Sequence, residues 1–266
     1  MRPLSTGSSQ EEETTMTITI DAATINQQPI FTSLEDERQH RKERLAAAFR
    51  VFAKLGYEEG VMGHFSVRDP EKTDHYWTNP FGLSFGLIKA SDLVLMNYEG
   101  KVVQGRGLVH PGGILLHLPI LRDNPHIISA AHTHSIYGRT WSAFGRLLDP
   151  LTAEAAVFYK RHAIYDSFEH GEGDNLAQAV GNNKVILLKN HGILSLGKTV
   201  EEAAYWFISF EKASHGQLLA EAAGSPTLIG EAHAERIANF TDEKFGWLNF
   251  QPYYQSIVTE QPELLN

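Results

Sequence analysis

Cysteine is absent from the 266-residue chain, and this absence removes several kinds of chemistry at once. Without thiols the chain can form no disulfide, offers no thiolate ligand to a metal and has no cysteine nucleophile. The cellular compartment therefore cannot be read from redox chemistry. A reducing cytosol is compatible with this composition, and we expect a cytoplasmic protein.

Long apolar runs and excess positive charge are also missing. No window approaches the roughly 20 apolar residues that a membrane span requires, so we expect no membrane partner. The 23 Lys and Arg residues are outnumbered by 32 Asp and Glu residues, which gives a formal net charge of −9. A nucleic-acid-binding protein would need a concentrated basic surface, so we expect no nucleic-acid partner.

The first thirty residues differ in composition from the rest of the chain. Up to Gln28 they are rich in Ser, Thr, Glu and Gln, and they contain no apolar segment of the kind found in signal peptides. We predict a disordered N-terminal tail over residues 1–30 and one folded domain over residues 31–266. Met16 is an alternative start.

Hydrophobic periodicity and turn residues predict the order of helices and strands. Ser33 and Thr199 are each followed three residues later by an acidic residue, which is typical of a helix N-terminus. Strands dominate the middle of the chain, so we expect an α/β protein with a central, mainly antiparallel sheet flanked by helices. The predicted segments are helices over 34–55, 113–121 and 200–223, and strands over 65–69, 76–79, 93–96, 101–103, 127–131 and 185–188.

Three histidines stand at the ends of two apolar segments. His132 and His134 follow the predicted strand over 127–131, and residues two apart on a strand point to the same face. His191 follows the second segment and precedes Gly192, where backbone can approach closely. Three neutral imidazoles can hold a divalent transition metal and leave positions open for substrate. The alternative is that these are ordinary turn or core histidines, since the chain has 13 histidines in all.

Five motifs occur in a fixed order that resembles the class II aldolase/adducin family, over about residues 34–224. The resemblance implies a three-layer αβα, class II aldolase-like fold and a homotetramer. It also implies that His132, His134 and His191 are the ligands of a divalent transition metal, either zinc, iron or manganese. The motifs are GVMGHFSVR at 60–68, NPFG at 79–82, ASDLV at 90–94, HTHS at 132–135 and KNHGIL at 189–194.

The chain departs from the phosphosugar aldolases of that family at two places. The family's catalytic glutamate lies four residues before a helix histidine that corresponds to His117, and Gly113 stands in its place. The family's phosphate-binding positions are also changed, and Phe81 offers no hydrogen-bond donor from its side chain. We expect a non-phosphorylated carbonyl substrate. The candidate substrate-binding residues are His64, Ser66, Phe81 and Gly82, with a purely structural hydrogen bond as the alternative role for His64.

The general acid or base is not obvious from the sequence. In the aldolases a tyrosine acid comes from a neighbouring subunit, and the matching segment here, residues 149–154, contains no tyrosine. Glu154 is the candidate acid/base at that place. Residues 157–159 alternate as a strand does, so we interpret their aromatic side chains as core. Arg68 and Asp69 are expected to form a strand-end ion pair.

Three classes of function remain open. The first is a metal-dependent carbon–carbon lyase, an aldolase or decarboxylase, acting on a small-molecule carbonyl substrate. The second is a non-haem iron oxygenase that decarboxylates aryl-2-oxo acids, as some members of the resembled family do; Trp77 and Phe81 would suit an aromatic acid. The third is an adducin-like interaction module without catalytic activity, which we rank lowest because this chain keeps the three histidines.

Overall fold

The computed structural model describes residues 27–166 and 173–266. Residues 1–26, which make up most of the predicted tail, lie outside the described residues. Within the described ranges the strands form one eight-stranded sheet of order β4-β3-β2-β1-β5-β8-β7-β6. The strands are β1 (His64–Arg68), β2 (His75–Thr78), β3 (Val94–Asn97), β4 (Val102–Gln104), β5 (Ser129–Thr133), β6 (His162–Tyr165), β7 (Val185–Leu188) and β8 (Gly192–Gly197).

Neighbouring strands run antiparallel, except for β6 and β7, which are parallel. The prediction of a mainly antiparallel sheet is therefore confirmed, and the predicted strand segments coincide with observed strands to within about two residues. The α-helices are α1 (Leu34–Lys54), α2 (Pro111–Asp123), α3 (Ile136–Ser142), α4 (Ala153–Ala156), α6 (Asp174–Gln178), α7 (Val200–Ala223), α8 (Glu231–Phe240) and α9 (Glu243–Glu260), and short 3₁₀ helices cover Phe85–Leu87, Ala90–Asp92 and Pro262–Leu265.

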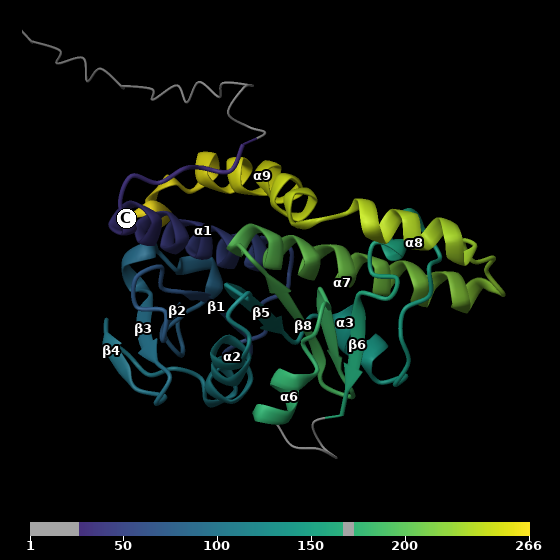
Figure 1. Cartoon of the computed structure of the whole chain (residues 1–266), viewed down its shortest axis with the longest axis horizontal. Helices are drawn as coiled ribbons and strands as arrows, with labels where there is room; N and C mark the ends of the chain where they lie inside the picture. Colours follow the sequence, from purple (N-terminus) through teal and green to yellow (C-terminus); the bar gives the residue numbers. More distant parts are fainter. Residues whose placement is uncertain (1–26, 167–172) are drawn as a thin grey trace, which may run out of the picture.

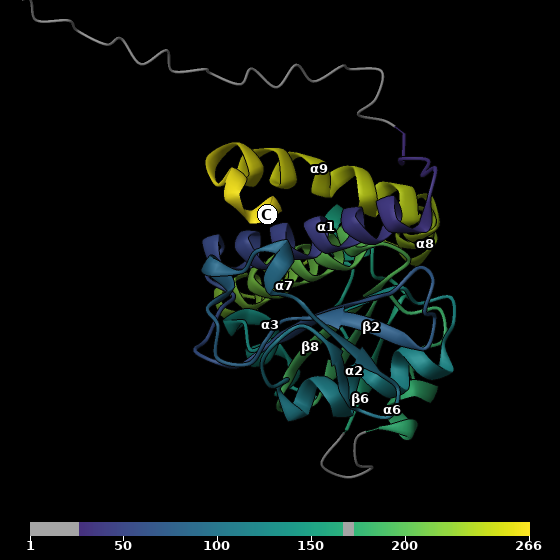
Figure 2. The ribbon, with the colours of Figure 1, turned by 90° about the vertical axis from the view of Figure 1, so that its left-hand side faces the viewer.

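Helices cover both faces of the sheet, which confirms the three-layer αβα fold (Figures 1 and 2). The layer of α1, α7 and α9 packs aromatic side chains, among them Phe52, Phe207 and Phe250, against sheet residues such as Phe65. The other face carries α2 and α6, with leucines such as Leu116 in its core. Side chains alternate along each strand, so β1 sends Phe65 to the first face and its neighbours to the second.

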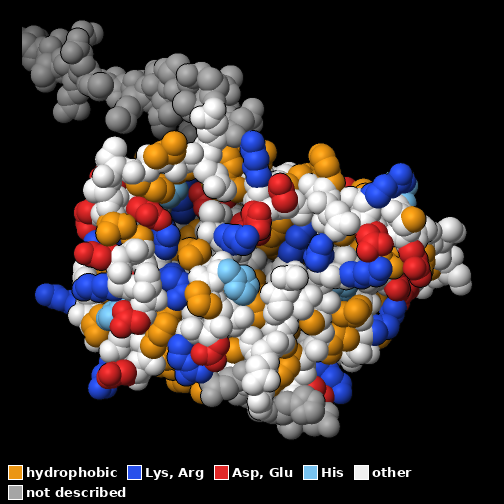
Figure 3. Space-filling model, in the orientation of Figure 1, with side chains coloured by type: hydrophobic (Ala, Val, Ile, Leu, Met, Phe, Trp, Pro, Cys, Tyr) orange, Lys and Arg blue, Asp and Glu red, His pale blue; other side chains and the backbone are white. Residues whose placement is uncertain are grey.

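The helix N-termini form as the sequence predicts. The Ser33 hydroxyl accepts a hydrogen bond from the Asp36 backbone N–H at 3.1 Å, and the Thr199 hydroxyl accepts one from Glu202 N–H at 3.1 Å. Each bond satisfies one of the amide groups that a helix N-terminus leaves without an intrahelical partner. No helix among the described residues is long and apolar enough to cross a membrane. On the face shown in Figure 3, basic and acidic side chains are interspersed.

Two expectations about local structure are wrong. Residues 157–159 form a turn after α4 and not a strand, because the helical turn that begins at Thr152 continues into them. Arg68 and Asp69 do not pair with each other, because successive strand residues point to opposite faces. Asp69 accepts hydrogen bonds from Arg38 at 2.7 Å and Trp77 at 2.9 Å, whereas Arg68 donates to backbone carbonyl groups on the α2 side, such as that of Ile127 at 2.9 Å.

Candidate metal centre

The three histidines singled out in the sequence meet at one end of the sheet. Their ring nitrogens offer one ligand atom each, and these atoms all lie within 4.8 Å of one another. His132 is the penultimate residue of β5, which pairs there with the beginning of β8. His191 lies in the turn between β7 and β8, and its Nε2 is 3.1 Å from the Nε2 of His134. Two adjacent strands therefore deliver the three side chains to one point.

Gly192 allows the close approach of these strands. A Cβ atom at this position would lie 3.3 Å from Cε1 of His132 and 3.2 Å from the carbonyl oxygen of Thr133. Both separations are tighter than ordinary van der Waals contact. The expectation that backbone approaches closely at Gly192 is confirmed.

His132 has a buried nitrogen atom that no protein group satisfies. Its Nδ1 lies 2.8 Å from the carbonyl oxygen of Ile193, and a carbonyl can only accept, so Nδ1 carries the proton. Nε2 is consequently a lone-pair acceptor, and this buried atom has no hydrogen-bond partner. Burial, followed by the proximity of His191 and His134, lowers the pKa of His132 well below 6.5. Burial likewise lowers the pKa of His134. A neutral imidazole with an unpartnered lone pair is the form that binds a metal.

A second group of side chains lies behind the three histidines, on the α2 face of the sheet. Nδ1 of His64 is 2.8 Å from Nε2 of His117, and Nδ1 of His117 is 2.6 Å from the hydroxyl of Ser66. The His64 ring lies 5.1 Å from the His132 ring, between centroids. Burial lowers the pKa of His117 to about 3, and it lowers that of His64 well below 6.5, so both rings are neutral.

This arrangement bears on Ser66 and Gly113. Ser66 is completely buried and its hydroxyl lies 2.6 Å from Nδ1 of His117, and substrate binding by Ser66 stays a prediction. A Cβ atom at Gly113 would lie 3.3 Å from Cγ of His64. The His64 ring therefore lies beside the position where the resembled aldolases would carry a glutamate side chain, and that space is not available to a larger residue without movement of His64.

His110 is a site residue that the sequence reasoning missed. It caps α2, its Nδ1 accepting from Gly112 N–H at 3.0 Å, and its ring centroid lies 5.7 Å from His64 and 5.5 Å from Phe81. Phe81 is 42% exposed, and the added Cβ position of Gly82 meets open space, so both lie at the surface beside this cluster. The order His-Pro-Gly, with proline at the first helical position, was the available signal for a capping His110.

Glu154, the candidate acid/base, is not part of the histidine cluster. Glu154 is exposed on α4 and lies near Tyr205 of α7. Burial raises the pKa of Tyr205, and the carboxylate of Glu154 raises it further. The acidic group that does influence His134 is Glu59, which forms an ion pair of 2.8 Å with Arg139 of α3. Sequence spacing held no signal for this pair, because Glu59 and Arg139 are brought together only by the fold.

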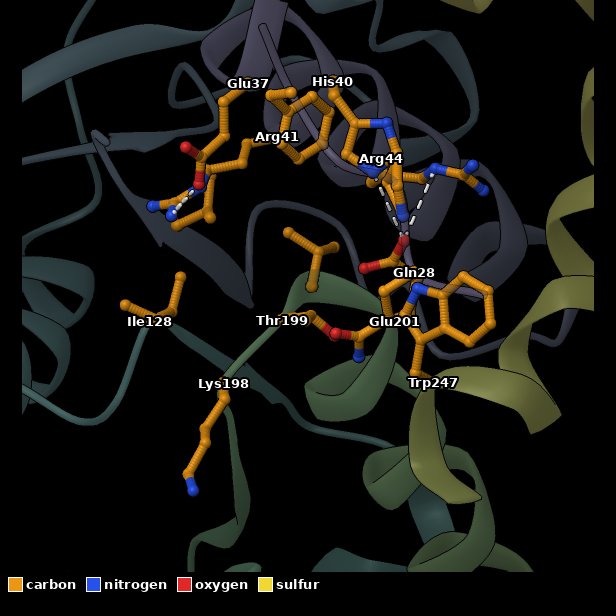
Figure 4. Close-up of a pocket in the computed structure, with 14 residues that line it drawn as sticks. Gln28, Glu37, His40, Arg41, Arg44, Ile128, Lys198, Thr199, Glu201 and Trp247 are labelled. Carbon is orange, nitrogen blue, oxygen red and sulfur yellow. Dashed lines mark hydrogen bonds and ion pairs between the residues drawn. The ribbon is translucent and has the colours of Figure 1, made fainter. Parts of the chain in front are cut away.

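A separate cavity of about 290 Å³ lies at the opposite end of the same strands, between α1, α9 and the beginning of α7 (Figure 4). Its floor includes Glu201, which is 2% exposed and lies 3.4 Å from Nε of Arg44 and 3.7 Å from Nε2 of His40. Figure 4 shows both basic side chains directed at one carboxylate oxygen. Charges of opposite sign therefore compensate one another in this cavity.

Comparison with known proteins agrees with the fold and the histidine cluster. Residues 43–218 match the model of the class II aldolase and adducin N-terminal domain. The chain is 36% identical over 249 residues to decarboxylase NovR of Streptomyces niveus, covering 90% of this chain and 92% of that protein. It is 34% identical over 248 residues to 4-hydroxy-3-prenylphenylpyruvate oxygenase/4-hydroxy-3-prenylbenzoate synthase of Streptomyces roseochromogenus subsp. oscitans, covering 89% and 88%.

Among solved structures, that of L-fuculose 1-phosphate aldolase from Glaciozyma antarctica PI12 superimposes with a TM-score of 0.86, at 38% identity, over 92% of this chain and 98% of that one. Fold and cluster together define a class II aldolase-type protein with three convergent histidines. The chain belongs to the class II aldolase and adducin family, whose enzymes act on small molecules.

Proposed function

We propose that His132, His134 and His191 hold a divalent transition metal, either zinc, iron or manganese, and that the protein is a metal-dependent enzyme. The observation that carries this proposal is the Nε2 atom of His132, which is buried, deprotonated and without a partner. A buried acceptor left unsatisfied costs free energy, and a cation in this position would remove that cost. Such an ion supplies Lewis acidity toward a carbonyl oxygen when it is bound.

The reaction that we favour is carbon–carbon cleavage, as an aldolase or a decarboxylase, on a carbonyl compound without phosphate. The exposed ring of Phe81 and the imidazole rings of His64 and His110 offer an apolar and weakly polar surface beside the three histidines. A phosphate would need several strong donors, usually cationic. In this proposal His64 contacts the substrate and is oriented by its bond to His117. Gly82 has no side chain and lies beside open space, so it leaves room for the substrate.

A second candidate function is oxidative decarboxylation of an aryl-2-oxo acid with iron as the metal. It is favoured by the 34% identity to a protein named as a prenylphenylpyruvate oxygenase, and by Gly113, where no carboxylate is available to fill a ligand position. The non-catalytic, adducin-like alternative is the weakest, because the histidine cluster is complete.

The proposal is tested by assaying metal-loaded protein on matched substrates. Unphosphorylated hydroxy-ketones and aryl-2-oxo acids are compared with ketose 1-phosphates, with and without dioxygen, while aldehyde release, carbon dioxide release and oxygen uptake are followed. We expect turnover of an unphosphorylated substrate. Aldehyde release without oxygen uptake indicates an aldolase, and carbon dioxide release without oxygen uptake indicates a decarboxylase. Carbon dioxide release coupled to oxygen uptake indicates the oxygenase. Vigorous cleavage of a ketose 1-phosphate would contradict the substrate class, and the relative of known structure named for that activity makes this a demanding test.

We also propose a homotetramer. Large apolar side chains are exposed on and after α3, beside the histidine cluster, with Ile136 at 60% and Phe144 at 55% exposure. Burial of such side chains between copies would remove them from water. Light scattering at micromolar concentration should give about four times the 29.7 kDa mass of one chain. A monomer would contradict the proposal.

A further inference from the structure

Glu211, on α7, is a buried carboxylate beside the metal centre that the proposed chemistry does not use. It is 1% exposed and accepts three hydrogen bonds. They come from the hydroxyl of Ser135 at 2.7 Å, from Tyr137 N–H at 2.8 Å and from Gly138 N–H at 2.6 Å. The three donors belong to one short segment, which directly follows His134 in the chain.

These contacts make Glu211 the cap of α3. The residue at the N-cap position is Ser135, and it makes no side-chain capping bond of its own. The carboxylate of Glu211 instead accepts from the first-turn amides, which have no intrahelical partner, and a negative charge at a helix N-terminus is favourable. The fit is close: a Cβ atom at Gly138 would lie 2.8 Å from Oε2 of Glu211.

His134 depends on such support more than His132 does. His132 lies within β5 and is held by the sheet and by its bond to the Ile193 carbonyl. His134 lies one residue beyond the end of β5 at Thr133, so no ladder hydrogen bond of that strand fixes its backbone. Glu211 anchors the next residue, Ser135, from another layer of the fold.

We infer that Glu211 is a positioning residue for His134, holding the segment 135–138 so that the His134 imidazole faces His191. This inference rests on the proposed metal centre. Groups that orient a ligand from outside the coordination sphere commonly change metal affinity by roughly 10–100-fold when they are removed.

The test is the variant Glu211→Gln, measured with zinc ion alone as the probe in protein without a histidine tag. A glutamine has a single oxygen, so one amide of the segment must face its NH₂ group. The zinc dissociation constant, obtained by competition with a chromogenic chelator, should rise by about 10-fold or more. Thermal unfolding of the metal-free protein reports stability separately.

Glu202→Gln is the matched control. Glu202 is also buried on α7, in the first turn of the helix, about nine residues before Glu211. It accepts hydrogen bonds from Lys198 N–H at 2.6 Å and from Trp206 Nε1 at 2.9 Å. Its loss should destabilise the metal-free protein and leave zinc affinity unchanged.

The outcomes separate the two proposals. Wild-type protein that binds no zinc at the histidines would refute the metal centre itself. Wild-type affinity in Glu211→Gln, or an equal loss of affinity in Glu202→Gln, would overturn the positioning role alone. If Glu211→Gln does not fold, the variant Ser135→Ala is used, because it removes one of the three hydrogen bonds to Glu211. A zinc dissociation constant raised about threefold or more in this variant supports the inference, and an unchanged one overturns it.

Discussion

The two ends of strands β1, β5 and β8 bury polar side chains in different ways. At one end the buried groups are neutral imidazoles, among them His64, His117 and His132. At the other end, roughly 13 Å away along β5, the buried carboxylate of Glu201 lies 3.4 Å from Nε of the half-buried Arg44. The histidine end presents lone pairs without any compensating cation, whereas the opposite end contains its own counter-charges.

The cavity at the Arg44 end is lined by charged groups that compensate one another. Burial alone would raise the pKa of Glu201, but the nearby His40 and Arg44 outweigh it and lower that pKa, so the carboxylate is charged and already attracted to its neighbours. The Arg44 guanidinium also lies 3.4 Å from the ring centroid of Tyr254. Nε of Arg44 and Oε1 of Glu201 are buried without a hydrogen bond, but they carry opposite charges 3.4 Å apart and compensate each other. Nε2 of His132, at the other end, also lacks a hydrogen bond, and the ionisable groups that lower its pKa are other histidines.

The largest expected effect is loss of the metal from the histidine end. His132→Ala, His134→Ala and His191→Ala should each weaken metal binding by about 100-fold or more, because one of three ligands is removed. Circular dichroism should show a preserved fold. His162→Gln is the control, since His162 is buried elsewhere and should not affect metal content. Wild-type occupancy in all three alanine variants would refute the ligand assignment.

The next effect concerns stability at the opposite end. Glu201→Ala leaves the Arg44 guanidinium without its counter-charge and should lower the free energy of unfolding by about 4 kcal/mol. The double variant Arg44→Leu/Glu201→Leu should recover most of this loss, because no charge is then left alone. Urea unfolding measures both. Zinc affinity should be unchanged, and a parallel loss of affinity would show that the two ends are not independent.

Acid should destabilise the protein through its neutral histidines. Burial lowers the pKa of His162 to about 4, below the usual 6.5, and its Nε2 accepts from Leu148 N–H at 2.9 Å. Protonation is therefore easier in the unfolded chain. The contribution of His162 is complete above pH 6.5 and is lost as the pH falls toward 4, by about 3 kcal/mol in total. Urea unfolding of the wild type and of His162→Gln across this pH range isolates the contribution of His162. If the free energy of unfolding depends on pH identically in the two proteins, the role given to His162 is contradicted.

The smallest effect distinguishes two glycines. Alanine at Gly113 should lower the free energy of unfolding by about 1 kcal/mol, because its Cβ meets the His64 ring at 3.3 Å and His64 is held by His117. Gly216 lies within α7, and an added Cβ there meets nothing within 4 Å. Gly216→Ala should therefore stabilise the protein by about 0.8 kcal/mol. Stabilisation by both substitutions would show that the His64 ring moves readily to make room for a methyl group at position 113.

Local patterns predicted much of this fold. The alternation in the strands and the hydroxyl caps at Ser33 and Thr199 placed most elements, because these signals depend on neighbouring residues only. The convergence of His132, His134 and His191 was also predicted, since each histidine follows a buried apolar strand. The strand predicted over residues 157–159 was wrong because a run of three residues is too short to distinguish a strand from a turn; Val157 and Phe158 are both buried there.

The remaining features depend on contacts between distant segments. The role of Glu211 requires α7 to lie beside the beginning of α3, about 75 residues earlier in the chain. The burial of Ser66 behind His117 follows from the packing of α2 on the sheet. No spacing rule reports such contacts, so the sequence predicted the convergence of the three histidines better than it predicted the residues packed around them.

X-ray absorption spectroscopy of zinc-loaded wild-type protein is the strictest test of the three-histidine metal site. The multiple-scattering pattern of imidazole counts histidine ligands at the metal. We predict three imidazole nitrogens at about 2.1 Å from zinc, falling to two in His134→Ala wherever zinc is retained. A zinc shell with fewer than three imidazoles in the wild-type protein, or one dominated by carboxylate oxygens, would contradict this prediction.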